Sequence, residues 1–129
     1  MNKINSFEDL LVWKKYHELV LKIYHITSAF PDIETFGLTS QIRKSSSSIT
    51  ANIAEGFGRY HHKDKIRFYI HARGSSTESL NHLILARDLH YISEAQYLEL
   101  KTILIEGQKM LNGLISGLVK FSDFNASSD

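Results

Sequence analysis

The segment from Arg59 to Arg67, RYHHKDKIR, gathers four fixed cations and one tyrosine against a single acid. Guanidinium and ammonium groups neutralise phosphates and release their counterions, and a tyrosine ring can stack on an unpaired base. The segment therefore predicts a nucleic-acid interface made of Arg59, Tyr60, Lys63, Lys65 and Arg67. Arg43 and Lys44 would extend this interface if the preceding helix presents them outward. The alternative is a solvated corner that is basic only for solubility.

Charge is unevenly distributed along the chain. The 129 residues carry a net charge of +1, which by itself indicates nothing about partners. Basic and acidic residues cancel over positions 1–58, whereas positions 59–92 have an excess of three positive charges and positions 93–129 an excess of two negative charges. The positive excess thus falls on one segment, where an anionic partner is expected. A ring of copies repeating that segment would strengthen weak binding through avidity.

A second set of polar residues belongs to the helix-forming segments: Gln41, Asn52, Glu55, Gly74, Ser75 and Glu78. Glu55 as a general base and Ser75 as a nucleophile would suggest catalysis. However, the sequence places no histidine to activate the serine, and no glycine-rich elbow presents it. The set is better explained as a polar seam, satisfied inside a bundle or across a subunit interface, in which Arg43 or Arg73 pairs with a glutamate. No enzymatic activity is predicted.

The seven histidines do not follow a metal-binding pattern. His17 and His25 are eight positions apart, and His71 and His82 are eleven positions apart. Neither spacing puts two imidazoles on adjacent turns of one helix, and no Glu-x-x-His motif occurs. The glycines around Gly56 lack the rest of a phosphate-binding fingerprint. No metal, cofactor or small-molecule substrate is therefore predicted.

Helices must position these side chains, because apolar residues repeat in steps of three and four along the chain. The sequence predicts a first helix that ends at Phe30-Pro31, a second within the stretch from Gly37 to Tyr60, a third from about Lys63 to Leu89, and a fourth from about Ser93 to Phe121. No strand or hairpin signal competes with them. Four amphipathic helices with short connections predict an all-α, antiparallel up-down-up-down four-helix bundle.

Local signals mark the predicted helix ends. The candidate N-terminal caps are Ser6 with Asp9 for the first helix, Thr35 for the second, and Ser93 with Gln96 for the fourth. Gly56 and Gly58 end the second helix, since glycine is favoured at a helix C-terminus.

The third helix is apolar on several faces. Ile66, Ile70, Leu80 and Ile84 share one face, and further apolar side chains lie on the others. This helix is therefore predicted to contact another subunit as well as its own bundle. Gly74, in the middle of this helix, lowers helix stability by about 1 kcal/mol relative to alanine. The expected compensation is the close approach of another backbone.

Composition indicates one domain. The chain has one proline and no low-complexity linker, so residues 1–121 are assigned to the bundle and residues 122–129, SDFNASSD, to a disordered polar tail. The absence of cysteine excludes disulfides and fits a reducing cytoplasm. The N-terminal residues lack a signal-peptide pattern, and no stretch approaches about 20 consecutive apolar residues. A cytoplasmic protein without membrane contact is expected.

Several stretches resemble one known family: SFEDLLVW at the start, FGLTSQIRKSSSSITANIAEGFGR in the second helix and GSSTES in the third. They cover the chain from about Phe7 to Leu118, and their combination is specific. The chain is identified as a member of the bacterial four-helix-bundle proteins encoded in intervening sequences of 23S ribosomal RNA genes, which are related to the accessory protein of diversity-generating retroelements. It departs from the family at Thr50, where proline is common, and at Ser45 and Ser46, where small apolar residues are usual.

The resemblance implies a homo-oligomer, expected to be a pentameric ring of bundles, with a basic surface for RNA or DNA and no enzymatic activity. The retroelement relative works as the partner of a reverse transcriptase. Two hypotheses follow. The first is a non-enzymatic oligomeric bundle that binds RNA or DNA electrostatically. The second is a protein-interaction scaffold or adaptor that does not bind nucleic acid directly.

Overall fold

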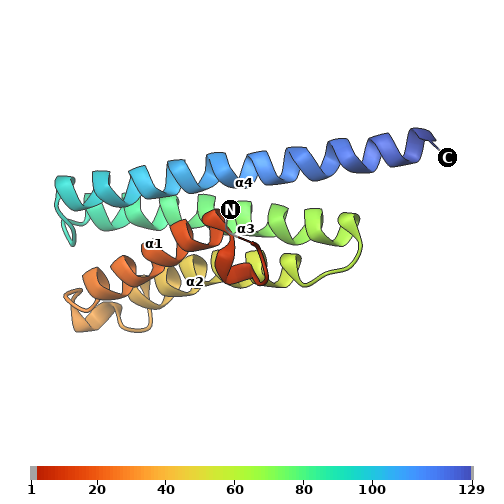
Figure 1. The fold of residues 1–129 in the computed structure, drawn as a ribbon. Coiled ribbons are helices and arrows are strands. Elements are labelled where there is room, and N and C mark those ends of the chain that lie inside the picture. Colours follow the sequence, from red (N-terminus) through yellow and green to blue (C-terminus); the bar gives the residue numbers. More distant parts are fainter. Residues whose placement is uncertain (1–2, 129) are drawn as a thin grey trace.

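Four α-helices make up the protein in a computed structural model that describes the backbone of residues 3–128 and the side chains of residues 3–121 (Figure 1). They are α1 (Leu11–Thr27), α2 (Leu38–Phe57), α3 (His62–Asp88) and α4 (Glu94–Ser128). Short 3₁₀ turns, Phe7–Asp9 and Asp32–Glu34, precede α1 and α2. Residues 3–128 contain no strand, so the predicted all-α fold is confirmed.

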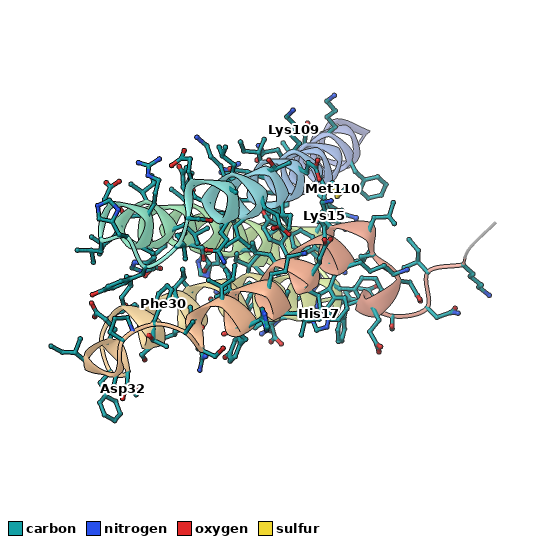
Figure 2. The ribbon with its side chains drawn as sticks, turned by 90° about the vertical axis from the view of Figure 1, so that its left-hand side faces the viewer. Lys15, His17, Phe30, Asp32, Lys109 and Met110 are labelled. Carbon is teal, nitrogen blue, oxygen red and sulfur yellow. The ribbon has the colours of Figure 1, made fainter. Side chains whose placement is uncertain are left out.

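Each helix contacts two others, so the four helices surround a shared core. α1 contacts α2 and α4, and α3 contacts α2 and α4. Side-chain pairs show that neighbours run antiparallel: Ser45–Ser79 and Ser48–Ser75 join α2 to α3, and Lys15–Glu106 and Lys22–Glu99 join α1 to α4. Phe30 and Asp32 lie together at the end of the bundle where α1 connects to α2, far from Lys109 and Met110 on α4 (Figure 2).

Two of the three predicted caps form. The Ser93 hydroxyl accepts the Gln96 backbone N–H at 3.1 Å and the Gln96 side-chain Oε1 accepts the Ser93 backbone N–H at 2.9 Å, which is the capping box predicted for α4. Ser6 and Asp9 also form a capping box, but it caps the 3₁₀ turn rather than α1. The prediction for Thr35 is wrong.

At the start of α2, the N-cap position belongs to Gly37, which has no side chain to offer. The Glu34 carboxylate takes over, accepting the Leu38 N–H at 3.2 Å and the Tyr91 hydroxyl at 2.9 Å. This acid therefore ties the α1–α2 connection both to α2 and to the α3–α4 connection.

The four aliphatic residues that share one face of α3 do not form its buried face. Ile66, Leu80 and Ile84 are only partly buried, and Ile70 is exposed. The residues that face the core are Tyr69, Ala72, Ser76, Ser79, Leu83 and Ala86, again in steps of three and four. Small side chains occupy this face because α3 lies close to α2, and larger aliphatic residues are displaced to its flanks.

Serine hydroxyls form a polar layer inside the bundle. Ser45 and Ser79 share a hydrogen bond of 2.8 Å between α2 and α3, and both residues are buried. On α1, the Tyr16 hydroxyl donates to the Ser76 hydroxyl at 3.0 Å. Because each buried hydroxyl has a partner, the polar layer specifies the register of these helices without leaving unpaired groups.

Two glycines allow close contact between helices. A Cβ at Gly56 would lie 2.8 Å from the Tyr69 ring, and one at Gly107 would lie 2.7 Å from the Tyr16 ring. Gly74, by contrast, is exposed and has no atom within 4 Å of an added Cβ. The close approach expected at Gly74 therefore does not occur within one chain.

The last helix continues beyond the predicted bundle. α4 extends to Ser128, whereas the polar sequence of residues 122–129 predicts a disordered tail. No glycine or proline follows Gly117, so nothing in the local sequence stops the helix there. Asp129 lies outside the described residues. Among the described helices, none is long and apolar enough to cross a membrane.

Replacing Gly107 by alanine should destabilise the protein by about 1–3 kcal/mol, because the new methyl group collides with the buried Tyr16 ring. Gly113→Ala is the matched control on the same helix, since no atom lies within 4 Å of its Cβ. That change should be neutral or should stabilise by about 0.5–1 kcal/mol through helix propensity. Urea denaturation measures both, and equal effects at the two positions would contradict the packing described.

Stability should fall at alkaline pH because two core tyrosines must ionise on unfolding. Burial raises the pKa of Tyr16 and of Tyr69 to about 12, above the ordinary value of 10.0. The stabilisation is therefore intact below about pH 10 and is lost between about pH 10 and pH 12, by about 3 kcal/mol per tyrosine. Urea denaturation at stepped pH measures the loss. Tyr69→Phe should show a shallower decline, and an equally steep one would assign the loss to other groups.

Candidate nucleic-acid interface

The predicted basic segment forms the corner between α2 and α3. α2 ends at Phe57, with the Gly58 N–H donating to Ala54 O at 3.2 Å, and α3 begins at His62. The connection is short and lies at the end of the bundle opposite the α1–α2 connection (Figure 1). Tyr60 is 88% exposed at this corner, and its ring meets the His61 ring at nearly a right angle, with 5.1 Å between centroids. Lys63 is also exposed.

Two arginines flank a phenylalanine beside this connection. The guanidinium carbons of Arg59 and Arg67 lie 4.6 Å and 4.9 Å from the centroid of the Phe68 ring. Each arginine also has an acidic neighbour: Arg59 donates to Glu55 at 2.6 Å, and Arg67 lies 3.8 Å from Asp64. These ion pairs are exposed and therefore weak, so both guanidiniums can exchange a carboxylate for a phosphate.

Lys65 has a different role from its neighbours. Its ammonium group donates to Phe57 O at 2.7 Å and to Gly56 O at 3.3 Å, and it lies 5.5 Å from the Phe57 ring centroid. These carbonyls belong to the last turn of α2, where a cation is favoured. Partial burial lowers the pKa of Lys65. Lys65 therefore closes the C-terminus of α2 and is not presented to a ligand.

Arg43 and Lys44 do not extend the corner. The Arg43 guanidinium donates to Thr27 Oγ1 at 2.8 Å and to Tyr24 O at 3.2 Å, so it closes the C-terminus of α1 as Lys65 closes that of α2. Its position precedes Arg59 by sixteen residues, or about 24 Å of helix. Lys44 is exposed beside it. The two residues lie toward the opposite end of α2 from Tyr60.

The predicted polar seam is only partly brought together. Ser75 and Ser48 share a hydrogen bond of 3.0 Å, and Asn52 donates to Ser48 O at 2.8 Å, so these residues form one network between α2 and α3. Gln41 and Gly74 are exposed outside it. The seam is therefore a short serine–asparagine cluster.

The glutamates of the predicted seam face outward, Glu55 toward Arg59 and Glu78 at 3.4 Å from His82. The predicted pairing of Arg43 or Arg73 with a glutamate is wrong, because Arg73 donates to the Asn112 side chain at 3.2 Å. The arrangement gives Glu55 and Ser75 separate partners, so it does not assemble a base with a nucleophile. Within the described part of the chain, no three potential ligands among His, Asp and Glu cluster around a metal position.

Sequence reasoning missed three residues near the corner. Phe68 supports both arginines, and Phe121 of α4 stacks on His62 with 4.6 Å between ring centroids. Lys120, which is exposed and precedes Phe121, is thereby brought to the same end of the bundle. No local signal reveals the contacts of α4, since they join residues about 60 positions apart.

We call the exposed surface formed by Arg59, Tyr60, Lys63 and Arg67 the basic corner.

The fold and the corner together describe a small all-α bundle with a basic surface at one end. Comparison with known proteins identifies the family to which the chain belongs. The chain belongs to the 23S rRNA-intervening sequence protein family, whose sequence profile matches residues 8–113. A solved structure from Bacteroides thetaiotaomicron, described as a protein of unknown function from the S23 ribosomal protein family, is similar with a TM-score of 0.74 and 27% identity over 81% of this chain and 98% of that chain. No curated protein matches the chain significantly.

Replacing Lys65 by methionine should destabilise the fold by about 1 kcal/mol, because the terminal carbonyls of α2 lose their cation while the aliphatic packing is kept. Lys63→Met removes the same charge two positions away, where Lys63 is exposed, and should change the unfolding free energy by less than about 0.5 kcal/mol. Thermal and urea denaturation compare the two variants. Equal stabilities would show that Lys65 does not act as a cap.

Proposed function

We propose that this protein is a non-enzymatic, oligomeric four-helix bundle that binds RNA or DNA through the basic corner. The observation that carries the proposal is that Arg59 and Arg67 lie over one ring, Phe68, on either side in sequence of the exposed Tyr60 and Lys63, while Lys65 and Arg43 serve as helix caps. Exposed cations that have no buried structural role are free to meet phosphates. Absence of cysteine supports a cytoplasmic location, where such a partner is found.

The number of cations limits the affinity of a single chain. With three phosphate contacts, the logarithm of the binding constant falls with the logarithm of the salt concentration with a slope of about two to three. Binding by one chain is therefore weak at physiological ionic strength. Several copies that engage one strand would raise the apparent affinity without any new contact. The proposal therefore includes a homo-oligomer, and the resemblance to the family favours a pentamer.

An exposed glycine in the middle of α3 supports an assembly. Gly74 has no atom within 4 Å of an added Cβ, unlike Gly56 and Gly107. A glycine inside a helix costs about 1 kcal/mol and is compensated when another helix approaches closely. The same observation favours the second candidate function, a protein-interaction scaffold. Recovery of one protein partner irrespective of nuclease treatment would support that candidate, and light scattering gives the subunit number in either case.

Binding should depend on the basic corner specifically. In fluorescence anisotropy titrations with labelled RNA and DNA, the variant Lys63→Gln/Arg67→Gln should bind more weakly than the parent protein. Its log–log salt slope should be smaller by about 1.5, since two phosphate contacts are removed.

The control is Lys22→Gln/Lys44→Gln, which removes two cations toward the other end of the bundle, where Lys22 pairs with Glu99 near the start of α4. It should retain the parent slope. The proposal fails if the parent protein does not bind either nucleic acid at low salt, or if the control variant loses as much affinity as the corner variant.

A further inference from the structure

We propose that the basic corner binds a single-stranded segment of nucleic acid, with an unpaired base stacked on Tyr60 and adjacent phosphates held by Lys63 and by the guanidiniums of Arg59 and Arg67. This inference rests on the proposed function and adds the strandedness of the ligand. It also assigns Tyr60 as the residue that contacts the base.

The Tyr60 ring is available for stacking. It is 88% exposed at the tip of the α2–α3 connection, and its only aromatic neighbour among residues 3–121 is His61, which lies nearly perpendicular to it. A tyrosine has few side-chain torsions to immobilise, so stacking costs it little conformational entropy. Every base has a π face, so such a contact does not require a particular sequence.

The two guanidiniums are held in place before any ligand arrives. Both lie within 5 Å of the centroid of the Phe68 ring, at 4.6 Å for Arg59 and 4.9 Å for Arg67. Phe68 itself is partly buried on α3 and thus fixed by the bundle. Stacking on an aromatic ring leaves the N–H edge of a guanidinium available for phosphate oxygens. Less side-chain entropy is lost on binding than for unsupported arginines.

A double helix fits this surface less well. Duplex recognition uses a helix or strand pair laid in a groove, or a long track of phosphate contacts, and the corner offers only a short turn between two helix ends. In a duplex the bases are already stacked on each other, so Tyr60 would gain no partner. Single-strand binders instead combine a few cations with aromatic platforms, as found here.

A second exposed aromatic residue lies at the other end of the bundle. Phe36 is 96% exposed in the α1–α2 connection, beside the acidic residues Asp32 and Glu34. Lys44 and Arg43 line the same shallow hollow as Phe36, but Arg43 is engaged by Thr27 Oγ1 and Tyr24 O at the end of α1. Phe36 therefore provides a control for an exposed aromatic ring, because it is about as exposed as Tyr60 but lies at the opposite end of α2 from the basic corner.

The test compares a labelled single-stranded oligonucleotide with a duplex of the same length and sequence at low salt, by fluorescence anisotropy. We expect the single strand to bind more tightly. Tyr60→Ala should weaken single-strand binding about tenfold, the loss of roughly one stacked base. Tyr60→Phe should keep most of the affinity because the ring remains. Phe36→Ala should bind like the parent protein, and circular dichroism should show all variants to be equally helical.

The outcomes separate this inference from the proposed function. If duplex and single strand bind equally and Tyr60→Ala weakens neither, the inference is overturned while the proposed function stands. If Phe36→Ala weakens binding as much as Tyr60→Ala, the assignment of the base contact to Tyr60 is overturned. If neither nucleic acid binds at low salt, both proposals fail.

Discussion

The tyrosine at position 16 connects three of the four helices. Its ring is fully buried and lies against Gly107 of α4, where a methyl group would already approach within 2.7 Å, and its hydroxyl donates to Ser76 of α3 at 3.0 Å. A glycine and a serine are required at those positions because a larger residue would separate the helices. The serine-rich interface between α2 and α3 fixes the register of these two helices through the Ser45–Ser79 and Ser48–Ser75 hydrogen bonds. It therefore holds the start of α3 against the end of α2, where the basic corner lies.

Two of the cations that the sequence assigns to a binding surface instead cap the C-termini of helices. Arg43 and Lys65 each donate to the last carbonyls of a preceding helix, α1 and α2 respectively. Both residues lie on the helix that follows the terminus they cap, and in each case the short connection between the helices brings the cation back to the carbonyls. A basic segment after a helix end can therefore serve stability and binding at once. Only the contacts of each side chain separate the two roles.

The family relationship covers most of the molecule but not its C-terminal part. The family profile ends at residue 113, whereas α4 continues to Ser128. Residues of this extension belong to the structure of the corner, since Leu114, Ile115 and Leu118 pack against the core and Phe121 stacks on His62. The four residues of the basic corner lie inside the part that matches the family, and the extension reaches the same end of the bundle through the contact between Phe121 and His62.

The number of helices, their approximate limits and the capping box of α4 can all be predicted from local residue patterns. These depend on periodicity and on contacts between residues a few positions apart, such as Ser93 with Gln96. Tertiary structure decided which face of α3 is buried, because the choice of Ser76 and Ser79 over Ile66 and Ile70 depends on how closely α2 and α1 approach. It also decided which cations remain exposed at the corner, since the partners of Arg43 and Lys65 are carbonyls on other helices. Such long-range geometry has no signature in local residue spacing.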